Sequence, residues 1–334
     1  MFLPAGIILD YFPVKKVILT ALTVMILNIT CMTLFSFSIL LIYFNVLMIG
    51  FTGAFTLLSC VKIATGFFKR KYLGFPISIG ITIAFLGGYF GNAVGQIVLD
   101  YFNSGDVVQI ANITLGITIL IIILTTVTPP KKIIKSEKIG NLIPNFQKVI
   151  LKKQNWLLGL YISLMNFPIM ILEFSFGQTF LSNNFNIPKK ECATIAGIIS
   201  IGYMVGGPLW NKTSDIVGRR KPFMMIGSFF LLSITICLFF KNLTVIQLML
   251  IFFLIGFLSS AQNLGYPLIS SSNDISISAS ATSLASLIIM GGGAIAQTSF
   301  GIVQNKVNSY SALIIIPICI LFALIACIFI EEKN

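Results

Sequence analysis

Long apolar segments recur along almost the whole chain, and they constrain the fold more than any other feature. Each is about 20 residues long or longer, the length needed to cross about 30 Å of hydrocarbon. Their approximate limits are 17–36, 40–66, 73–99, 108–128, 156–181, 192–210, 222–240, 245–269, 277–303 and 310–330. A backbone in lipid must satisfy its own hydrogen bonds, which favours helices. The sequence therefore predicts an all-α, polytopic membrane protein with about ten spans.

Composition excludes several other classes of protein. Hydrophobic residues make up 57% of the chain and charged residues 10%, with a mean hydropathy of +0.98, whereas soluble domains have about 25% charged residues. The chain has no histidine, which excludes a histidine metal cluster and a Ser-His catalytic pair. The six cysteines lie within or beside apolar segments without paired spacing. We therefore expect no catalytic residues, no metal site, no cofactor and no enzymatic activity.

The distribution of cations predicts the orientation in the membrane. The net charge is +12, but the cations form short clusters without aromatic interleaving, so nucleic acid is not an expected partner. All Lys and Arg residues except Lys62, Lys189, Lys190, Lys241 and Lys306 fall on one side of the predicted spans. Such an excess marks the cytoplasmic side. We expect a multi-pass plasma membrane protein, in the inner membrane of a bacterium, with its C-terminus in the cytoplasm.

A short charged pattern occurs twice, at 6–16 and at 211–221, with Asp10 and Asp215 in equivalent positions. In each copy the acidic residue lies where an apolar segment ends, and cations precede the next segment. Recurrence of this hairpin predicts two homologous halves. A carboxylate at a helix end can accept hydrogen bonds from the first turn of a neighbouring helix and pair with cations. Both aspartates are thus expected to join cytoplasmic helix ends, unless they are incidental acids in ordinary positively charged loops.

The two hairpins resemble the G-x-L-x-D-R-x-G-R-R/K signature of the major facilitator superfamily, which follows its second and eighth helices. Tyr11 and Pro13 depart from that signature in the first copy, and Asn211 departs in the second. The stretch 206–222 also resembles bacterial uptake members for small organic solutes. The resemblance implies a secondary transporter or symporter that works by alternating access. It implies a gating role for Gly6, Asp10, Lys15, Lys16, Asp215, Gly218, Arg219 and Arg220.

The resemblance also predicts the domain limits. Residues 1–129 would form an N-terminal bundle of four spans and a stub, 130–155 a cytoplasmic linker with an amphipathic stretch at Leu142–Leu151, and 156–334 a six-helix bundle. Since the first hairpin begins at residue 6, the first helix and most of the second are expected to be missing. Two interpretations stay open: a transporter of a small organic solute, or a non-functional remnant or partial subunit of a split transporter. We expect a monomer in the lipid bilayer.

Two charged residues lie inside predicted spans. A charge at such a position costs about 2.5–3.5 kcal/mol, so Lys62 should face a cavity, pair with an acid or extend its ammonium to the interface. In a facilitator its segment would line the substrate cavity. Glu173 follows Asn166 and Pro168 in a segment that would also line the cavity. It is predicted either to take up a coupling proton or bind a substrate ammonium, or to bond a neighbouring helix near the external interface.

Uncharged polar residues give further candidates for a substrate site. Gln262, Asn263 and Tyr266 lie within the apolar segment 245–269. In the resembling family this segment would again be a cavity wall. Hydrogen bonding between helices is an equally good explanation for them.

Overall fold

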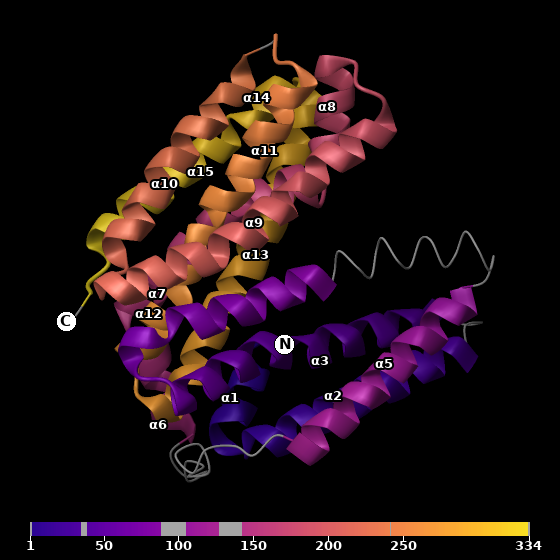
Figure 1. Cartoon of the computed structure of the whole chain (residues 1–334), viewed down its shortest axis with the longest axis vertical. Helices are drawn as coiled ribbons and strands as arrows, with labels where there is room; N and C mark the ends of the chain where they lie inside the picture. Colours follow the sequence, from indigo (N-terminus) through magenta and orange to yellow (C-terminus); the bar gives the residue numbers. More distant parts are fainter. Residues whose placement is uncertain (1, 35–38, 88–104, 127–141, 241, 333–334) are drawn as a thin grey trace.

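The computed structural model describes residues 2–34, 39–87, 105–126, 142–240 and 242–332 (Figure 1). These residues form helices and short connections, and no strand occurs among them, which confirms the all-α prediction. Within the described residues eight helices are long and apolar enough to cross a membrane. The two other predicted spans, 73–99 and 108–128, overlap the helical residues 74–87 and the helix α5, and the rest of each prediction falls on residues outside the described ranges.

The first half of the structure consists of residues 2–126. Its elements are α1 (Phe2–Tyr11), α2 (Val14–Leu34), α3 (Ile39–Phe67), the 3₁₀ turn η1 (Arg70–Tyr72), the helical residues 74–87 and α5 (Gly105–Thr126). The amphipathic helix α6 (Leu142–Leu151) follows. Part of the predicted linker, and the connection between the predicted spans 17–36 and 40–66, lie outside the described residues.

The second half consists of residues 153–332. It contains α7 (Lys153–Pro168), the π-turn η4 (Ile169–Glu173), α8 (Gly177–Phe185), α9 (Lys189–Val217), α10 (Lys221–Ile236), η5 (Cys237–Phe239), α11 (Val245–Ser259), η6 (Ser260–Leu264), α12 (Gly265–Ser272), η7 (Ile275–Ile277), α13 (Ser278–Lys306), α14 (Ser309–Leu313) and α15 (Ile315–Phe329). In Figure 1 the two halves meet near α1, α12 and α13 and diverge toward the opposite ends of their helices.

Two helix limits differ from the sequence prediction. The predicted span 156–181 is interrupted, because Phe174 N donates to Ile169 O at 3.2 Å and Phe176 N to Ile171 O at 2.7 Å, which widens the helix by one residue per turn. A Cβ at Gly177 would lie 1.8 Å from Leu172 O, so this turn requires glycine. The span predicted at 192–210 continues to Val217, since Asn211, Ser214 and Asp215 are buried against other helices.

The halves approach closely because small residues lie at their contact. A Cβ at Gly6 of α1 would lie 2.5 Å from Ser283 Oγ and 2.8 Å from Ala279 O of α13. The apolar cluster around α1 and α3, which includes Ala5, Leu9 and Leu58, contains Ala279 as well. The N-terminal helix is therefore packed onto the second half.

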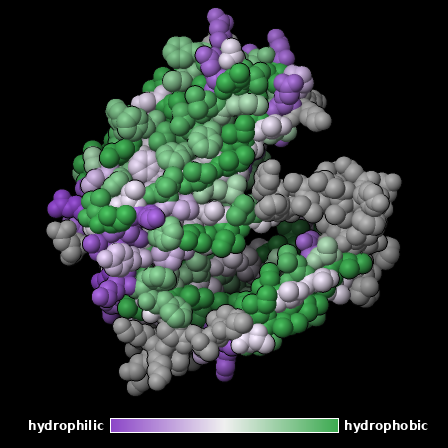
Figure 2. All heavy atoms as spheres, in the orientation of Figure 1, coloured by the Kyte–Doolittle hydropathy of each residue, from purple (hydrophilic) through white to green (hydrophobic). Residues whose placement is uncertain are grey.

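Apolar side chains cover much of the exterior of both halves in Figure 2, and hydrophilic side chains gather at the helix ends. This distribution is the one expected of helices that face lipid. Both repeat hairpins, η1, η7 and the C-terminal residues lie at the same end of the structure. We call this end the hairpin face and define it by residues 11–14, 68–74, 217–221, 272–278 and 328–332.

Candidate functional site

The first hairpin contacts the second half through Asp10, the residue before the end of α1. Its side chain is buried, and its carboxylate accepts hydrogen bonds from the first turn of α13, from Ala279 N at 3.2 Å and from Ser280 N at 2.8 Å. The first amides of a helix have no partner within the helix and carry a partial positive charge. Asp10 satisfies two of them across the boundary between the halves.

The cation that pairs with Asp10 is Lys62 of α3. Its ammonium forms a buried ion pair with Asp10 and donates to Ile275 O at 2.8 Å and Ser276 O at 3.3 Å. An ammonium has three donors, so each has an acceptor here. The cations of the first hairpin itself do not pair with Asp10 in this structure. Lys15 donates to Leu124 O at 3.0 Å, and Lys16 is exposed.

The second hairpin makes the corresponding contact, here from the second half to the first. Asp215 of α9 accepts hydrogen bonds from Gly74 N at 3.3 Å and Phe75 N at 2.9 Å, at the start of the helical residues 74–87. Arg220 Nη2 lies 3.1 Å from Asp215 Oδ1 and also donates to Arg70 O and Lys71 O of η1. Asp10 and Asp215, the equivalent acids of the two hairpins, thus each cap a helix of the other half.

Glycines allow the second hairpin to form. Gly218 has φ of +80° after the end of α9, a conformation that glycine adopts without strain. A Cβ at Gly74 would lie 2.7 Å from Asn211 Oδ1 and 2.8 Å from Asp215 Oδ1, so the amide of Gly74 can approach the carboxylate. Arg219 is exposed and takes no part in this contact.

A buried group of polar side chains lies inside the second half, where α7, α9 and η6 meet. We call Asn166, Tyr203, Gln262 and Asn263 the amide cluster. Gln262 Nε2 donates to Asn166 Oδ1 at 3.1 Å and to the Tyr203 hydroxyl at 3.0 Å, and that hydroxyl donates to Asn263 Oδ1 at 2.7 Å. All four side chains are at most 7% exposed.

Two fully buried atoms of the amide cluster have no hydrogen-bond partner among the described residues. Gln262 Oε1, an acceptor, and Asn263 Nδ2, a donor, are buried without a hydrogen bond. Leaving such groups unpaired costs about 1–3 kcal/mol each. The cluster also adjoins the first half, because the Tyr203 ring stacks on Phe85 with centroids 4.4 Å apart. Together these features describe a polar site with one spare donor and one spare acceptor at the boundary between the halves.

Glu173 lies apart from Lys62 and ends the π-turn η4. It accepts a hydrogen bond from Ser200 of α9 through Oε1, while its Oε2 is buried and has no partner in the described part of the chain. Tyr266 is buried but makes no hydrogen bond with the described residues. The structure therefore brings Asn166, Gln262 and Asn263 together, and it places Lys62 at the hairpin face and Glu173 beside α9.

Sequence reasoning missed the α9 residues of this region, Tyr203 and Ser200. A pattern that could have indicated them is the spacing of Ser200, Tyr203 and Gly207, which places the three on one face of a helix. Gly207 belongs with the site, because a Cβ there would lie 3.0 Å from Asn263 Nδ2.

Comparison with known proteins identifies related folds. A family model described as Major Facilitator Superfamily matches residues 1–188 and 158–334. The Escherichia coli fucose:proton symporter FucP is similar over 99% of this chain and 87% of its own, at 13% identity and a TM-score of 0.79. A bacterial homologue of the iron transporter ferroportin, in an outward-facing state, is similar over 98% and 85% at 12% identity and 0.74. The human organic anion transporter MFSD10 is similar over 98% and 80% at 13% identity and 0.75. No curated protein sequence gives a significant match.

Proposed function

This multi-pass membrane protein belongs to the major facilitator superfamily, and on that premise we propose that it is a secondary transporter that binds a small neutral solute at the amide cluster. The observation that carries this proposal is the pair of unsatisfied atoms, Gln262 Oε1 and Asn263 Nδ2. A hydroxyl or amide of a solute can donate to the first and accept from the second. The structural relatives named above share at most 13% identity, so they support the fold and not the substrate.

The substrate is proposed to be neutral because the amide cluster contains no charged side chain. Lys62, the cation that could bind an anionic solute, has its three donors occupied by Asp10, Ile275 and Ser276. We assign Lys62 to the contact between the halves instead. Glu173 keeps one free carboxylate oxygen, and we propose it as the site of a coupling proton. The fucose:proton symporter among the relatives supports symport as the form of coupling.

The contacts at the hairpin face are proposed to be the cytoplasmic gate. Asp10 and Asp215 each bond a helix of the other half, so the gate is closed in this structure. The opposite ends of the two halves diverge in Figure 1, and relatives in outward conformations have similar folds. Opening would separate Asp10 from α13 and Asp215 from Gly74, and the amide cluster would then be reached from the cytoplasm.

The substrate site is tested by removing an amide from the cluster. Gln262→Leu should reduce counterflow of the transported solute in proteoliposomes by about tenfold or more, because a hydrogen bond to a buried polar group is lost. The solute would be found by screening labelled sugars, polyols and amino acids. Gln297→Leu is the matched control, since this amide bonds Met170 O outside the cluster. Equal rates in both variants would rule out the cluster as the substrate site.

Proton coupling is tested at Glu173. Glu173→Gln keeps the shape of the side chain but cannot release a proton. We expect this variant to lose uphill uptake driven by a pH gradient while it retains exchange of solute between the two sides. Unchanged uphill uptake would exclude Glu173 as the coupling site.

A further inference from the structure

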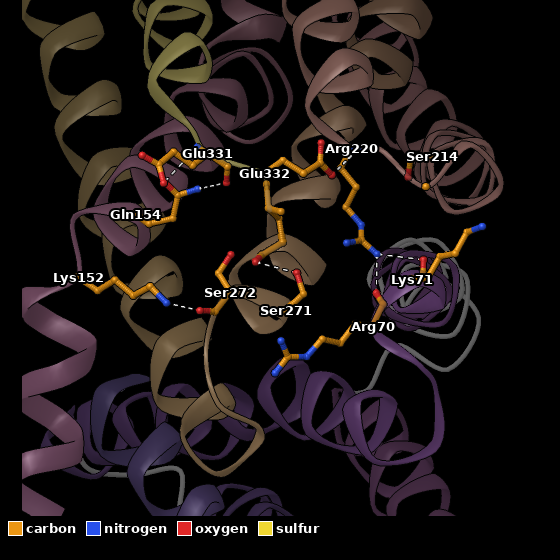
Figure 3. Close-up of a pocket in the computed structure, with 12 residues that line it drawn as sticks. Arg70, Lys71, Lys152, Gln154, Ser214, Arg220, Ser271, Ser272, Glu331 and Glu332 are labelled. Carbon is orange, nitrogen blue, oxygen red and sulfur yellow. Dashed lines mark hydrogen bonds between the residues drawn. The ribbon is translucent and has the colours of Figure 1, made fainter. Parts of the chain in front are cut away.

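A polar cavity of about 650 Å³ opens on the hairpin face, and none of the residues that line it belongs to the amide cluster (Figure 3). Its walls come from both halves of the protein. Arg70 of η1 belongs to the first half, and Lys152, Ser272, Arg220 and Glu332 belong to the linker region and the second half. The volume is within the range of about 300–1,000 Å³ that is usual for small-molecule sites.

Positive charge is in excess in this cavity. Its lining includes the cations Arg70, Lys71, Lys152 and Arg220 against the acids Glu331 and Glu332. The carboxylate of Glu332 is already engaged, because it accepts hydrogen bonds from Arg220 N at 2.6 Å and Lys221 N at 2.9 Å at the start of α10. Glu331 is exposed, and its backbone N–H and C=O form hydrogen bonds with the side-chain amide of Gln154. An anion in the cavity would therefore meet more unused cationic donors than acids.

Two arginines have donors without a partner. The Arg70 guanidinium makes no hydrogen bond or ion pair with the described part of the chain, and in Figure 3 its side chain extends among the lining residues with no dashed line at its end. Arg220 is 7% exposed, and its Nε is buried without a partner. On the opposite wall Lys152 is fixed by bonds to Ser272 O and Asn273 Oδ1. The planar fork of an arginine matches two oxygens of a phosphate or carboxylate.

We propose that this cavity binds the phosphate group of an anionic ligand, with Arg70 as its principal donor. The phosphate can belong to a phospholipid headgroup, which basic pockets between membrane helices bind, or to a soluble phosphorylated molecule, because both present the same oxygens to an arginine. Since Arg70 belongs to the first half, whereas Arg220 belongs to the second half and Lys152 lies on the opposite wall, a bound phosphate joins the halves beside the Asp215 contact. The ligand thereby stabilises the closed hairpin face, which is a regulatory effect separate from solute binding at the amide cluster.

Binding of inorganic phosphate to the purified full chain tests the proposal directly and requires no transport. We expect saturable binding by isothermal titration, with a rise in the thermal midpoint. Arg70→Gln should weaken the affinity about tenfold or more, since the charge-assisted hydrogen bonds from the guanidinium to the phosphate are lost. Arg70 is exposed and its side chain is unpaired among the described residues, so this variant should fold, which size-exclusion chromatography checks.

Lys69→Gln is the matched control, because Lys69 is the exposed cation next to Arg70 and does not line the cavity. Its phosphate affinity should stay within about threefold of the unmodified protein, since Lys69 lies outside the cavity and would act on the phosphate only through solvent and salt. Nanodiscs of phosphatidylcholine, with or without phosphatidylglycerol, then distinguish the two sources of phosphate. A stabilisation by phosphatidylglycerol that Arg70→Gln removes identifies a lipid headgroup, whereas stabilisation by inorganic phosphate in both kinds of disc identifies a soluble ligand. If neither phosphate nor phosphatidylglycerol distinguishes Arg70→Gln from the unmodified protein, the proposal is wrong.

Discussion

At the scale of single residues, two buried carboxylates, those of Asp10 and Asp215, each cap the start of a helix in the other half. Asp10 and Asp215 both accept two backbone amides from a helix of the other half, but their cations come from different places. Lys62 reaches Asp10 from α3, whereas Arg220 reaches Asp215 from the hairpin itself. A lysine that sequence reasoning considered for a substrate site is thus a structural partner of the hairpin repeat.

Replacement of Lys62 tests that partnership. Lys62→Gln leaves the buried Asp10 carboxylate without its cation, and removing one member of a buried ion pair costs about 3–5 kcal/mol. We expect a large fall in the thermal midpoint of the purified protein, partly recovered by adding Asp10→Asn, which removes the remaining charge. Lys16→Gln, at an exposed position, should change stability by about 0.5 kcal/mol or less. If the loss of stability in the double variant equalled the sum of the losses in Lys62→Gln and Asp10→Asn, the two residues would not be coupled, and the pairing would be contradicted.

Replacement of Asp10 tests the gate. Asp10→Asn loses the charge that bonds Ala279 N and Ser280 N, so the hairpin face should open more often. We expect a cysteine introduced at the buried Ser278, on a background without native cysteines, to react about tenfold faster with a maleimide. Asp274→Asn is the control, because Asp274 is an exposed acid beside the same helix start. A faster reaction in the control alone, or in neither variant, would argue against gating by Asp10.

At the scale of elements, close helix contacts determine where the two halves can meet. α1 lies against α13 only because Gly6 has no Cβ, and the atoms it would strike include the backbone oxygen of Ala279. A backbone atom inside a helix cannot move aside without shifting the helix. The leading glycine of the first repeat is therefore required by packing between the halves, independently of any role of the hairpin in transport.

Gly6→Ala should consequently weaken the contact between α1 and α13. Inserting a methyl group into a packed site costs about 1–3 kcal/mol, and we expect a lower thermal midpoint together with faster labelling at Ser278→Cys. Gly53→Ala is the matched control, since nothing lies within 4 Å of a Cβ at this α3 position and alanine is the better helix former by about 1 kcal/mol. Similar stability of the two variants would show that α13 can move aside.

At the scale of the whole molecule, the two halves differ in how much surface their helices bury. In the most apolar stretch of α2, 17% of the residues are buried, and in that of α3, 22%. In the corresponding stretch of the segment formed by α7 and η4, 78% of the residues are buried. A groove of about 540 Å³ between α2, α3 and α5 adds to the exposed apolar surface of the first half. Burial of apolar surface stabilises packing between helices, so the second half is the more cohesive unit.

The orientation of the whole chain gives a further prediction. The cation distribution predicts that position 140 is in the cytoplasm and position 105 outside. We expect Gly140→Cys to react with a membrane-impermeant maleimide only after the cytoplasmic side is exposed, and Gly105→Cys to react in intact cells. Labelling of both positions from the outside would require a different topology.

The sequence alone determined the class of the protein, the positions of its spans and the two hairpins, because helix formation in lipid depends on local hydrophobicity and flanking charge. It also indicated Asn166, Gln262 and Asn263 as candidates for a substrate site. Only the tertiary structure decided that Asp10 pairs with Lys62, and that Tyr203 joins the amides of η6. Those partners lie tens of residues apart and come together by helix packing, which depends on the fit of whole helix surfaces and leaves no local pattern in the chain. The same reason explains the cavity at the hairpin face, whose arginines come from separate halves.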